Sequence, residues 1–229
     1  MPTFDLASAT VRELNAALHA LGADAVGEEW TVTSPRGAHA VAVGARVPVR
    51  IRIAGHVGYY CAGMNQHAEI TVDGNAGVGV AENMMSGRVH VRGDASQSAG
   101  ATANGGLLLI DGNASARCAI SLKGGDVVVK GNVGHMSAFM AQAGTLVVLG
   151  DAGDALGDSL YECRIYVRGK VAGTGADCVR KKMKDKHRSQ LGALLETAGL
   201  AGEVDVADFQ RFGSARRLYH FHIDNVDAY

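Results

Sequence analysis

A glycine-rich stretch early in the chain, ITVDGNAGVGVAENMMSG (residues 70–87), has the composition of a phosphate-binding loop. A β-branched run leads into Gly74, and Gly77 and Gly79 follow at close spacing. Glycine-rich turns that follow a strand and open a helix hold phosphates through their backbone N–H groups. That chemistry needs one special loop before a helix, so a nucleotide site depends on this stretch being unlike the rest of the chain.

Other residues with catalytic or metal-binding chemistry are scattered. The nine histidines, among them His56, His67, His90 and His135, show no common ligand spacing, and no metal site is predicted. The cysteines form no Cys-x-x-Cys pair, so we expect buried, reduced thiols at Cys61, Cys118, Cys163 and Cys178. No Ser-His-Asp set or activated cysteine stands out, and the sequence therefore predicts no catalytic or cofactor-binding residue.

Charge and composition exclude several classes of protein. The net charge is −1, which gives no global attraction to nucleic acid or membranes. The basic run RKKMKDKHR (residues 180–188) is interpreted as a solvated helical face, because nucleic-acid binding needs a wider patch with aromatics. No leader or long apolar segment is visible, so we expect a cytoplasmic protein. The combination of 47% apolar residues, 31 glycines and only 5% aromatics disfavours disorder and helical bundles.

The glycines recur at one strict period of 19 residues. Seven of them fall in register: Gly55, Gly74, Gly93, Gly112, Gly131, Gly150 and Gly169. Residues two and four positions before each glycine are aliphatic, and the residue seven positions after it is alanine or glycine. The opening loop is therefore one member of seven similar turns, which argues against a nucleotide site.

A repeat of this kind predicts a solenoid in which each unit carries a short strand and buries its apolar face only by stacking. Strands of successive coils would pair in parallel, and seven coils would span roughly 34 Å. Left-handed hexapeptide helices use multiples of six residues, so we predict a right-handed parallel β-helix. The glycine at each strand end is expected to allow a sharp bend, with positive φ as one way to make it. The position after it is Asn or Asp in five of the seven coils and predicts a partial side-chain ladder: His56, Asn75, Asp94, Asn113, Asn132, Asp151 and Lys170.

Two outward-facing columns carry information about surfaces. The residue before each column glycine alternates in charge along much of the stack, as in Asp73, Arg92, Asp111 and Lys130, which predicts pairing between neighbouring coils and not an acidic cleft. The residue three before each glycine is polar in the early coils and then apolar at Leu109, Val128, Val147 and Tyr166. An apolar face of this size must be covered. We predict these four residues as a candidate partner-docking face, with the C-terminal segment of the same chain as the alternative cover.

The ends of the chain depart from the period and define three segments. Residues 1–29 contain a predicted capping helix with a Thr10/Glu13 capping box and an end at Gly22. Residues 30–176 form the β-helix, with residues 32–50 as a degenerate first coil in which Val32 aligns with Ile51. Residues 177–229 form a helical and aromatic extension, with helices expected at SQLGALLETAGL and VADFQRFG. Its aromatic residues are interpreted as anchors on the solenoid: Phe209, Phe212, Tyr219, Phe221 and Tyr229.

The corner-and-strand signature SGRVHVRG, NGGLLLIDG, KGGDVVVKG and QAGTLVVLG resembles the GXGXG domain that ends the glutamate synthase large subunit. The resemblance covers roughly residues 30–175 and implies a right-handed parallel β-helix. The layout VGYYCAGMNQ, GVAENMMSG, GHMSAFMAQ, GDALGDSLYE and FGSARRLYHFHIDN is similar to the free-standing β-helix subunit of N-methylglutamate synthase.

The resemblance implies a non-catalytic subunit of a glutamate-synthase-like transferase complex active in methylamine metabolism. Its implied partners are a glutamine-amidotransferase-like subunit and an FMN-binding synthase-like subunit that carries an iron–sulfur cluster. Two alternatives stay open: the same solenoid in a formylmethanofuran dehydrogenase or formyltransferase complex, and a stand-alone carbohydrate-active β-helix enzyme.

Overall fold

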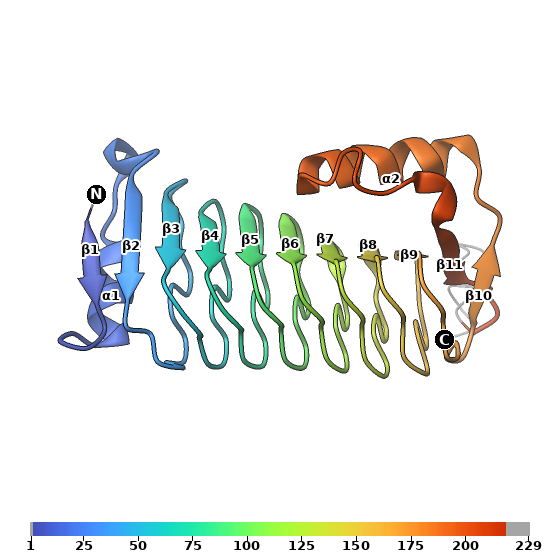
Figure 1. The fold of residues 1–229 in the computed structure, drawn as a ribbon, viewed down its shortest axis with the longest axis horizontal. Helices are drawn as coiled ribbons and strands as arrows, with labels where there is room; N and C mark the ends of the chain where they lie inside the picture. Colours follow the sequence, from blue (N-terminus) through green and yellow to red (C-terminus); the bar gives the residue numbers. More distant parts are fainter. Residues whose placement is uncertain (1, 219–229) are drawn as a thin grey trace, which may run out of the picture.

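The computed structural model describes residues 2–218, and its strands form one 11-stranded sheet with the order β1-β2-β3-β4-β5-β6-β7-β8-β9-β11-β10 (Figure 1). The first two strands are β1 (Thr3–Asp5) and β2 (Glu29–Thr33). The coil strands are β3 (Arg50–Ile53), β4 (Glu69–Val72), β5 (Arg88–Val91), β6 (Leu107–Ile110), β7 (Lys123–Val129), β8 (Ala143–Val148) and β9 (Arg164–Val167). The last two are β10 (Cys178–Lys181) and β11 (Gln210–Ser214).

The strands β3 to β9 stack in parallel with the predicted register. Ile51 lies beside Ile70 and Val72 lies beside Val91, so partners are 19 residues apart along the stack. A second line of parallel bridges runs through the position two residues after each glycine, from Val57 and Ala76 onward. Because both lines bury their side chains in one continuous core, the chain is a parallel β-helix, as the repeat predicted.

A third wall of each coil explains the column of alanine and glycine. Ala62, Ala81 and Ala119 are fully buried and have φ of 56°, 56° and 58°, while Gly100 in the same column has φ of 68°. A positive φ is costly for bulky and β-branched side chains, and the core leaves no room for them. The column is therefore restricted by backbone conformation as well as by space.

Glycine is required at each strand end for a different reason from the expected positive φ. Among the seven column glycines only Gly55 has a positive φ, of 140°. At Gly131 an added Cβ would lie 2.6 Å from the Asn113 side-chain oxygen and 2.6 Å from the Gly112 carbonyl oxygen. The glycines thus make room for the side chain and backbone of the preceding coil.

The predicted ladder is present, with a precise pattern of donors and acceptors. The Asn132 N–H donates to Asn113 Oδ1 at 2.9 Å, and the Asp151 N–H donates to Asn132 Oδ1 at 2.7 Å. The ladder begins at His56, whose Nδ1 accepts from Asn75 N–H at 2.9 Å, and ends where Lys170 N–H donates to Asp151 Oδ1 at 2.7 Å. Side chains therefore bond mainly to the next backbone and not to one another.

The first coil does not keep the register that the sequence suggested. Val32 lies beside Ile53, and Trp30 takes the place beside Ile51, so β2 is shifted by two residues from the prediction. On the opposite wall Ala42, with φ of 55°, is the buried counterpart of Ala62. The first coil is longer than the others, and a strict step of 19 residues misplaces it.

The N-terminal end is covered by α1 (Val11–His19) and a short 3-10 helix, η1 (Ala23–Ala25). The Thr10/Glu13 capping box is confirmed, and Leu14 and Leu18 of α1 are buried in the core of the coils. The helix ends at His19 with Ala20 as its C-cap, which is earlier than the predicted end at Gly22. The strand β1 was missed by the sequence and pairs in parallel with β2.

The C-terminal end is closed by β11, which pairs antiparallel with both β9 and β10. The predicted helix is α2 (Asp185–Ala198), and Gly199 ends it with φ of 83°. VADFQRFG forms only a 3-10 helix, η2 (Val206–Asp208), before it continues into β11.

Two further predictions concern this end of the chain. The basic run of residues 180–188 is divided between β10 and the start of α2, so the prediction of one helical face was wrong. The predicted anchors Phe209 and Phe212 are buried, whereas Tyr219, Phe221 and Tyr229 lie outside the described residues.

Changing Gly131 to alanine should destabilise the protein. The new methyl group meets two fixed oxygens of the preceding coil, and overpacking of this kind costs about 1–3 kcal/mol. Gly192→Ala is the matched control, because Gly192 lies within α2 and its Cβ would have only an ordinary contact with Val206 at 3.8 Å. That change should stabilise by up to about 1 kcal/mol. Urea denaturation of both variants measures the difference, and equal stabilities would contradict this account of the column.

Candidate functional site

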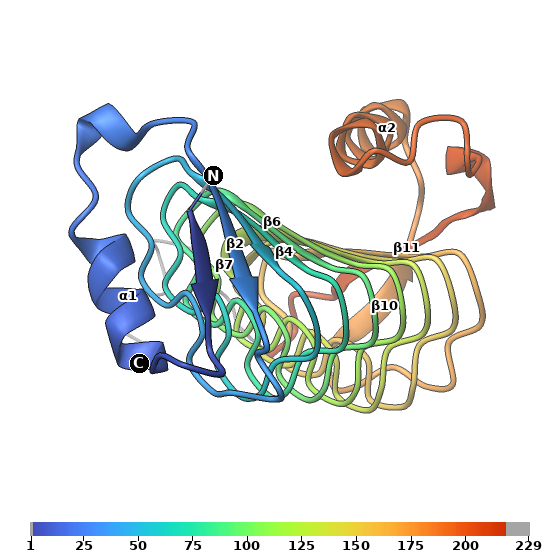
Figure 2. The same cartoon turned by 60° about the vertical axis from the view of Figure 1, so that its left-hand side comes forward.

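The apolar outer column of the coils is covered by the chain's own C-terminal segment. Leu109, Val128, Val147 and Tyr166 are at most 4% exposed, and they form a second apolar cluster outside the coils. The cluster is completed by Leu191, Leu195 and Ala198 of α2 together with Leu200 and Phe209. Figures 1 and 2 show α2 lying across the strands β6 to β9 on this face. Of the two covers that the sequence allowed, the structure contains the intramolecular one.

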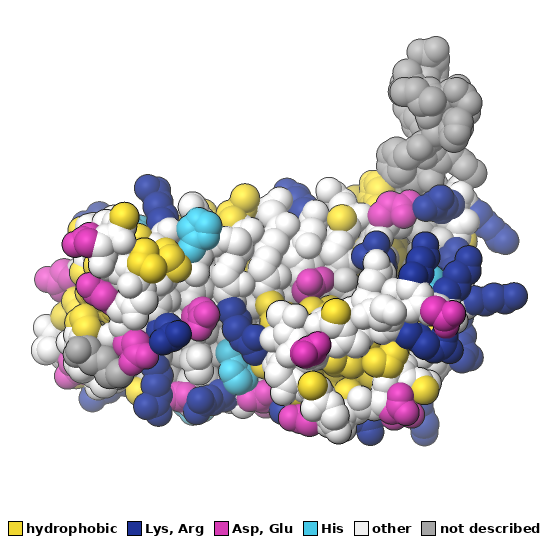
Figure 3. All heavy atoms as spheres, turned by 90° about the horizontal axis from the view of Figure 1, so that it is seen from above, with side chains coloured by type: hydrophobic (Ala, Val, Ile, Leu, Met, Phe, Trp, Pro, Cys, Tyr) yellow, Lys and Arg dark blue, Asp and Glu magenta, His cyan; other side chains and the backbone are white. Residues whose placement is uncertain are grey.

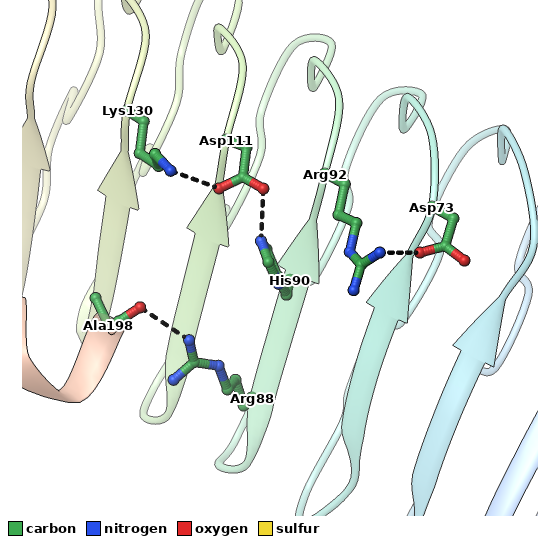
Figure 4. Close-up of polar contacts among 7 residues, drawn as sticks. All are labelled: Asp73, Arg88, His90, Arg92, Asp111, Lys130 and Ala198. Atoms are coloured by element: carbon green, nitrogen blue, oxygen red, sulfur yellow. Dashed lines mark hydrogen bonds and ion pairs between the residues drawn. The ribbon is translucent and has the colours of Figure 1, made fainter. Parts of the chain in front are cut away.

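A single arginine ties the end of α2 to the coils. The Arg88 guanidinium, from β5, donates to the Thr197 carbonyl at 2.7 Å and to the Ala198 carbonyl at 3.1 Å. Figure 4 shows the second of these bonds. Carbonyls in the last turn of a helix have no partner within the helix, and a cation there also complements the helix dipole. Arg88 therefore stabilises α2 at the point where the apolar column gives way to polar residues.

A groove of about 890 Å³ runs between α2 and the coils. Its floor contains the row Asp126, Thr145 and Arg164, which are neighbours in the strand register. Burial raises the pKa of the Asp126 carboxyl above its usual value, and a hydrogen bond with Thr145 and the charge of Arg164 oppose this effect. The groove thus has polar strand residues on one side and side chains of α2 on the other.

The charged outward column pairs between coils, as predicted. Asp73 lies 3.2 Å from Arg92 and also pairs with Arg52. Asp111 lies between His90, at 2.9 Å, and Lys130, at 3.4 Å (Figure 4). Each of these carboxylates is flanked by positively charged or protonatable side chains, which suits a stabilising ladder and leaves neither as an unpaired acid for hydrolysis.

The four cysteines are free and buried in the structure. Burial raises the pKa of Cys61, Cys118 and Cys163 to about 12. A thiol with such a pKa is almost entirely protonated at neutral pH, and the thiolate is the reactive form. The cysteines therefore serve as small apolar side chains.

Within residues 2–218 no cluster of three or more His, Cys, Asp or Glu side chains could hold a metal ion. In the same range no helix has the length and apolar character needed to cross a bilayer.

The role of Arg88 and the groove beneath α2 were not found by sequence reasoning. Arg88 is the first residue of β5. From the sequence alone, a charged residue at this position is indistinguishable from any solvent-exposed residue at the start of a strand. The only available signal was the change from polar to apolar residues along the outer column, which indicates that a cover begins near the third or fourth coil.

The fold and this covered face define the class of protein as a parallel β-helix with a helical lid on one side. No family model matches the chain. It is 61% identical to Protein GlxC of Rhizobium meliloti (strain 1021) over 229 residues, which is 100% of this chain and 100% of that protein. The chain belongs to the same family as GlxC.

Replacing Arg88 with methionine should loosen the last turn of α2. Methionine keeps an apolar stem but cannot donate to the two carbonyls, and the loss of these partly exposed hydrogen bonds should cost about 1 kcal/mol. Amide hydrogen exchange at residues 195–198 should then be roughly fivefold faster, with the coil strands unchanged. The control is Arg46→Met, because Arg46 is an exposed residue in a loop. Unaltered exchange in α2 would show that Arg88 does not anchor the helix.

Replacing Asp126 with asparagine should remove one step from the pH dependence of stability. A carboxyl whose pKa is raised by folding makes the folded state less stable as pH rises from the unfolded value near 3.8 through the folded value. The Asp126→Asn variant should gain stability relative to the parent over that range and keep the gain at neutral pH. Thermal unfolding of both proteins between pH 3 and pH 8 measures the difference, with Asp24→Asn as an exposed control. A constant difference across this range would contradict the raised pKa.

Proposed function

We propose that this chain is the non-catalytic β-helix subunit of a glutamate-synthase-like complex, and specifically of an N-methylglutamate synthase. The complex would convert methylamine and glutamate into N-methylglutamate and ammonia. The observation that carries the proposal is the complete stack of 19-residue coils, which is the fold implied by the resemblance to the GXGXG domain.

In this proposal the chemistry belongs to two partner subunits. One is a glutamine-amidotransferase-like subunit, and the other is an FMN-binding synthase-like subunit with an iron–sulfur cluster. The β-helix contributes a rigid support, because its polar side chains accept backbone hydrogen bonds from one coil to the next.

A surface suited to a partner lies on the early coils. Tyr59, Tyr60 and Met64 belong to one coil and Met85 to the next, and each is about half exposed, between 48% and 52%. Tyr59 also lies against His39, with ring centroids 4.6 Å apart. Tyrosine and methionine are enriched at protein interfaces, so this patch supports the role of a subunit within a complex.

The two alternatives differ in their support. The formyltransferase-type complex uses the same solenoid, and only the identity of the partners separates it from the favoured proposal. The carbohydrate-active enzyme would need a pair of free acidic groups, whereas Asp73 and Asp111 are held in ion pairs along the stack.

Affinity purification of the tagged chain from its native host, grown on methylamine, tests the proposal. Mass spectrometry should identify an amidotransferase-like subunit and an FMN-binding synthase-like subunit, and the purified complex should release ammonia from glutamate in the presence of methylamine. Formyltransferase subunits in their place would overturn the favoured assignment, and a chain recovered alone would overturn both assignments to a complex.

The double change Tyr60→Ser and Met64→Ser should lower recovery of these partners at least tenfold, because central aromatic contacts commonly contribute 2 kcal/mol or more. Val26→Ser is the matched control, since Val26 is 59% exposed and lies at the N-terminal end away from that wall. Full recovery with the double variant would place the interface on another face.

A further inference from the structure

A second, smaller pocket of about 210 Å³ lies at the end of the molecule where β9, β11 and the start of α2 meet. Its wall is almost entirely polar and consists of one carboxylate, Glu162, together with Arg164, Lys186, His187, Gln190, Arg211 and Arg216. Figure 3 shows Lys and Arg side chains gathered around this end of the molecule. The proposed function above does not use this pocket.

Three elements bring the basic side chains together. Arg164 and Tyr166 alternate with core residues along β9, and Arg211 of β11 is the direct partner of Tyr166 in the antiparallel register. Lys186 and Gln190 are four residues apart on α2, so they share one face of the helix. The pocket therefore forms only when the last coil, β11 and α2 are all in place.

The positive charge of the pocket is poorly compensated. Arg216 is paired with Glu162 at 2.9 Å. In the described part of the chain, Arg164, Lys186 and Arg211 have no carboxylate within 4.0 Å. Like charges held close together repel one another, most strongly away from bulk water. A bound anion would reduce this repulsion further than Glu162 does, because Glu162 is already paired with Arg216.

One buried donor of this pocket also lacks an acceptor among the described residues. The Nε of Arg211 is buried and has no hydrogen-bond partner. The Arg211 side chain lies beside the hydroxyl of Tyr166, which belongs to the larger groove beneath α2, and makes one long bond from Nη1 to the Lys182 carbonyl at 3.5 Å. An unpaired buried polar group is costly, and since the guanidinium can only donate, the missing partner of Nε is an acceptor.

His187 adds a further donor. The residue is 6% exposed, and its Nδ1 accepts from the Lys184 N–H at 3.1 Å, which leaves the proton of the neutral ring on Nε2. Burial, followed by the charges of Arg211, Lys186, Lys184 and Arg164, lowers the pKa of His187. The ring is therefore neutral at neutral pH and can still donate from Nε2.

We propose that this pocket binds a small oxyanion, a carboxylate or phosphate group, through Arg164, Arg211 and Lys186. Guanidinium groups match the planar, two-oxygen edge of such anions. Because the pocket spans three elements, the bound anion also fastens the start of α2 to the last coil, just as Arg88 fastens its end.

Calorimetric titration of the full-length chain with inorganic phosphate and with succinate, at constant ionic strength set by chloride, tests the proposal. One saturable site is expected for at least one of the two probes. Arg211→Gln and Lys186→Gln should each weaken binding about tenfold or more. Arg180→Gln should bind normally, because Arg180 is exposed and pairs in register with Phe212 instead of facing the pocket.

The Lys186→Gln variant should fold like the parent, since lysine and glutamine have similar helix propensities and Lys186 lies in the first turn of α2. Weaker binding by this variant therefore cannot be attributed to unfolding. Binding should also raise the pKa of His187 in NMR titrations, with His187→Gln used to assign the signal. Saturation by phosphate alone or succinate alone identifies the class of oxyanion. The proposal is overturned if both probes give only a non-saturable effect, or if affinity is the same in the parent and in all the glutamine variants.

Discussion

The structure depends on one repeated interaction, in which an Asn or Asp side-chain oxygen accepts the backbone N–H of the residue stacked on it in the next coil. Asn113 does this for Asn132, and Asn132 does it for Asp151. The same oxygens occupy the space that a Cβ would need at Gly131 and Gly150. A coil that gained or lost a residue before this corner would lose the hydrogen bond and the fit at once, so the ladder keeps the coils between His56 and Lys170 at 19 residues. The outward columns of side chains have the same 19-residue spacing, and these include the charge pairs and the face beneath α2.

Much of this could be predicted because periodicity reports on stacking directly. The aliphatic columns, the ladder and the inter-coil pairs of Asp73 and Asp111 all follow from one spacing. The reason why glycine is required at each strand end could not be predicted. A glycine that recurs in the sequence does not show whether the site needs a positive φ or a close approach of neighbouring atoms. The first coil was misplaced because it has no glycine at the strand end to align: Ser34 lies at that position, two residues after Val32, which is paired with Ile53. The strands β10 and β11 carry no repeat, and their antiparallel pairing depends on contacts between distant residues.

The cover of the apolar column illustrates a choice that sequence patterns leave open. Both α2 and the column are apolar on one face, but neither pattern identifies the partner of the other. Only Lys182, Met183 and Lys184 separate β10 from α2, so the helix is held close to the sheet at a high effective concentration. A separate protein would have to lose translational and rotational freedom to take its place. For that reason the intramolecular cover prevails in the chain by itself.

Two chemically different surfaces result, and the β-helix holds them apart. The early coils present half-exposed Tyr60 and Met64, whereas the C-terminal junction presents Arg164, Arg211 and Lys186 around a small pocket. Neither surface lies inside the stack, where side chains are committed to the core or to the ladder. Because the coils between them are fixed by backbone and side-chain hydrogen bonds at every step, the distance between the two surfaces is set by the number of coils. A support that separates the proposed protein-binding patch from the proposed anion-binding pocket by a rigid stack would need no chemistry of its own to influence a complex, since it would determine where each partner and each ligand lies.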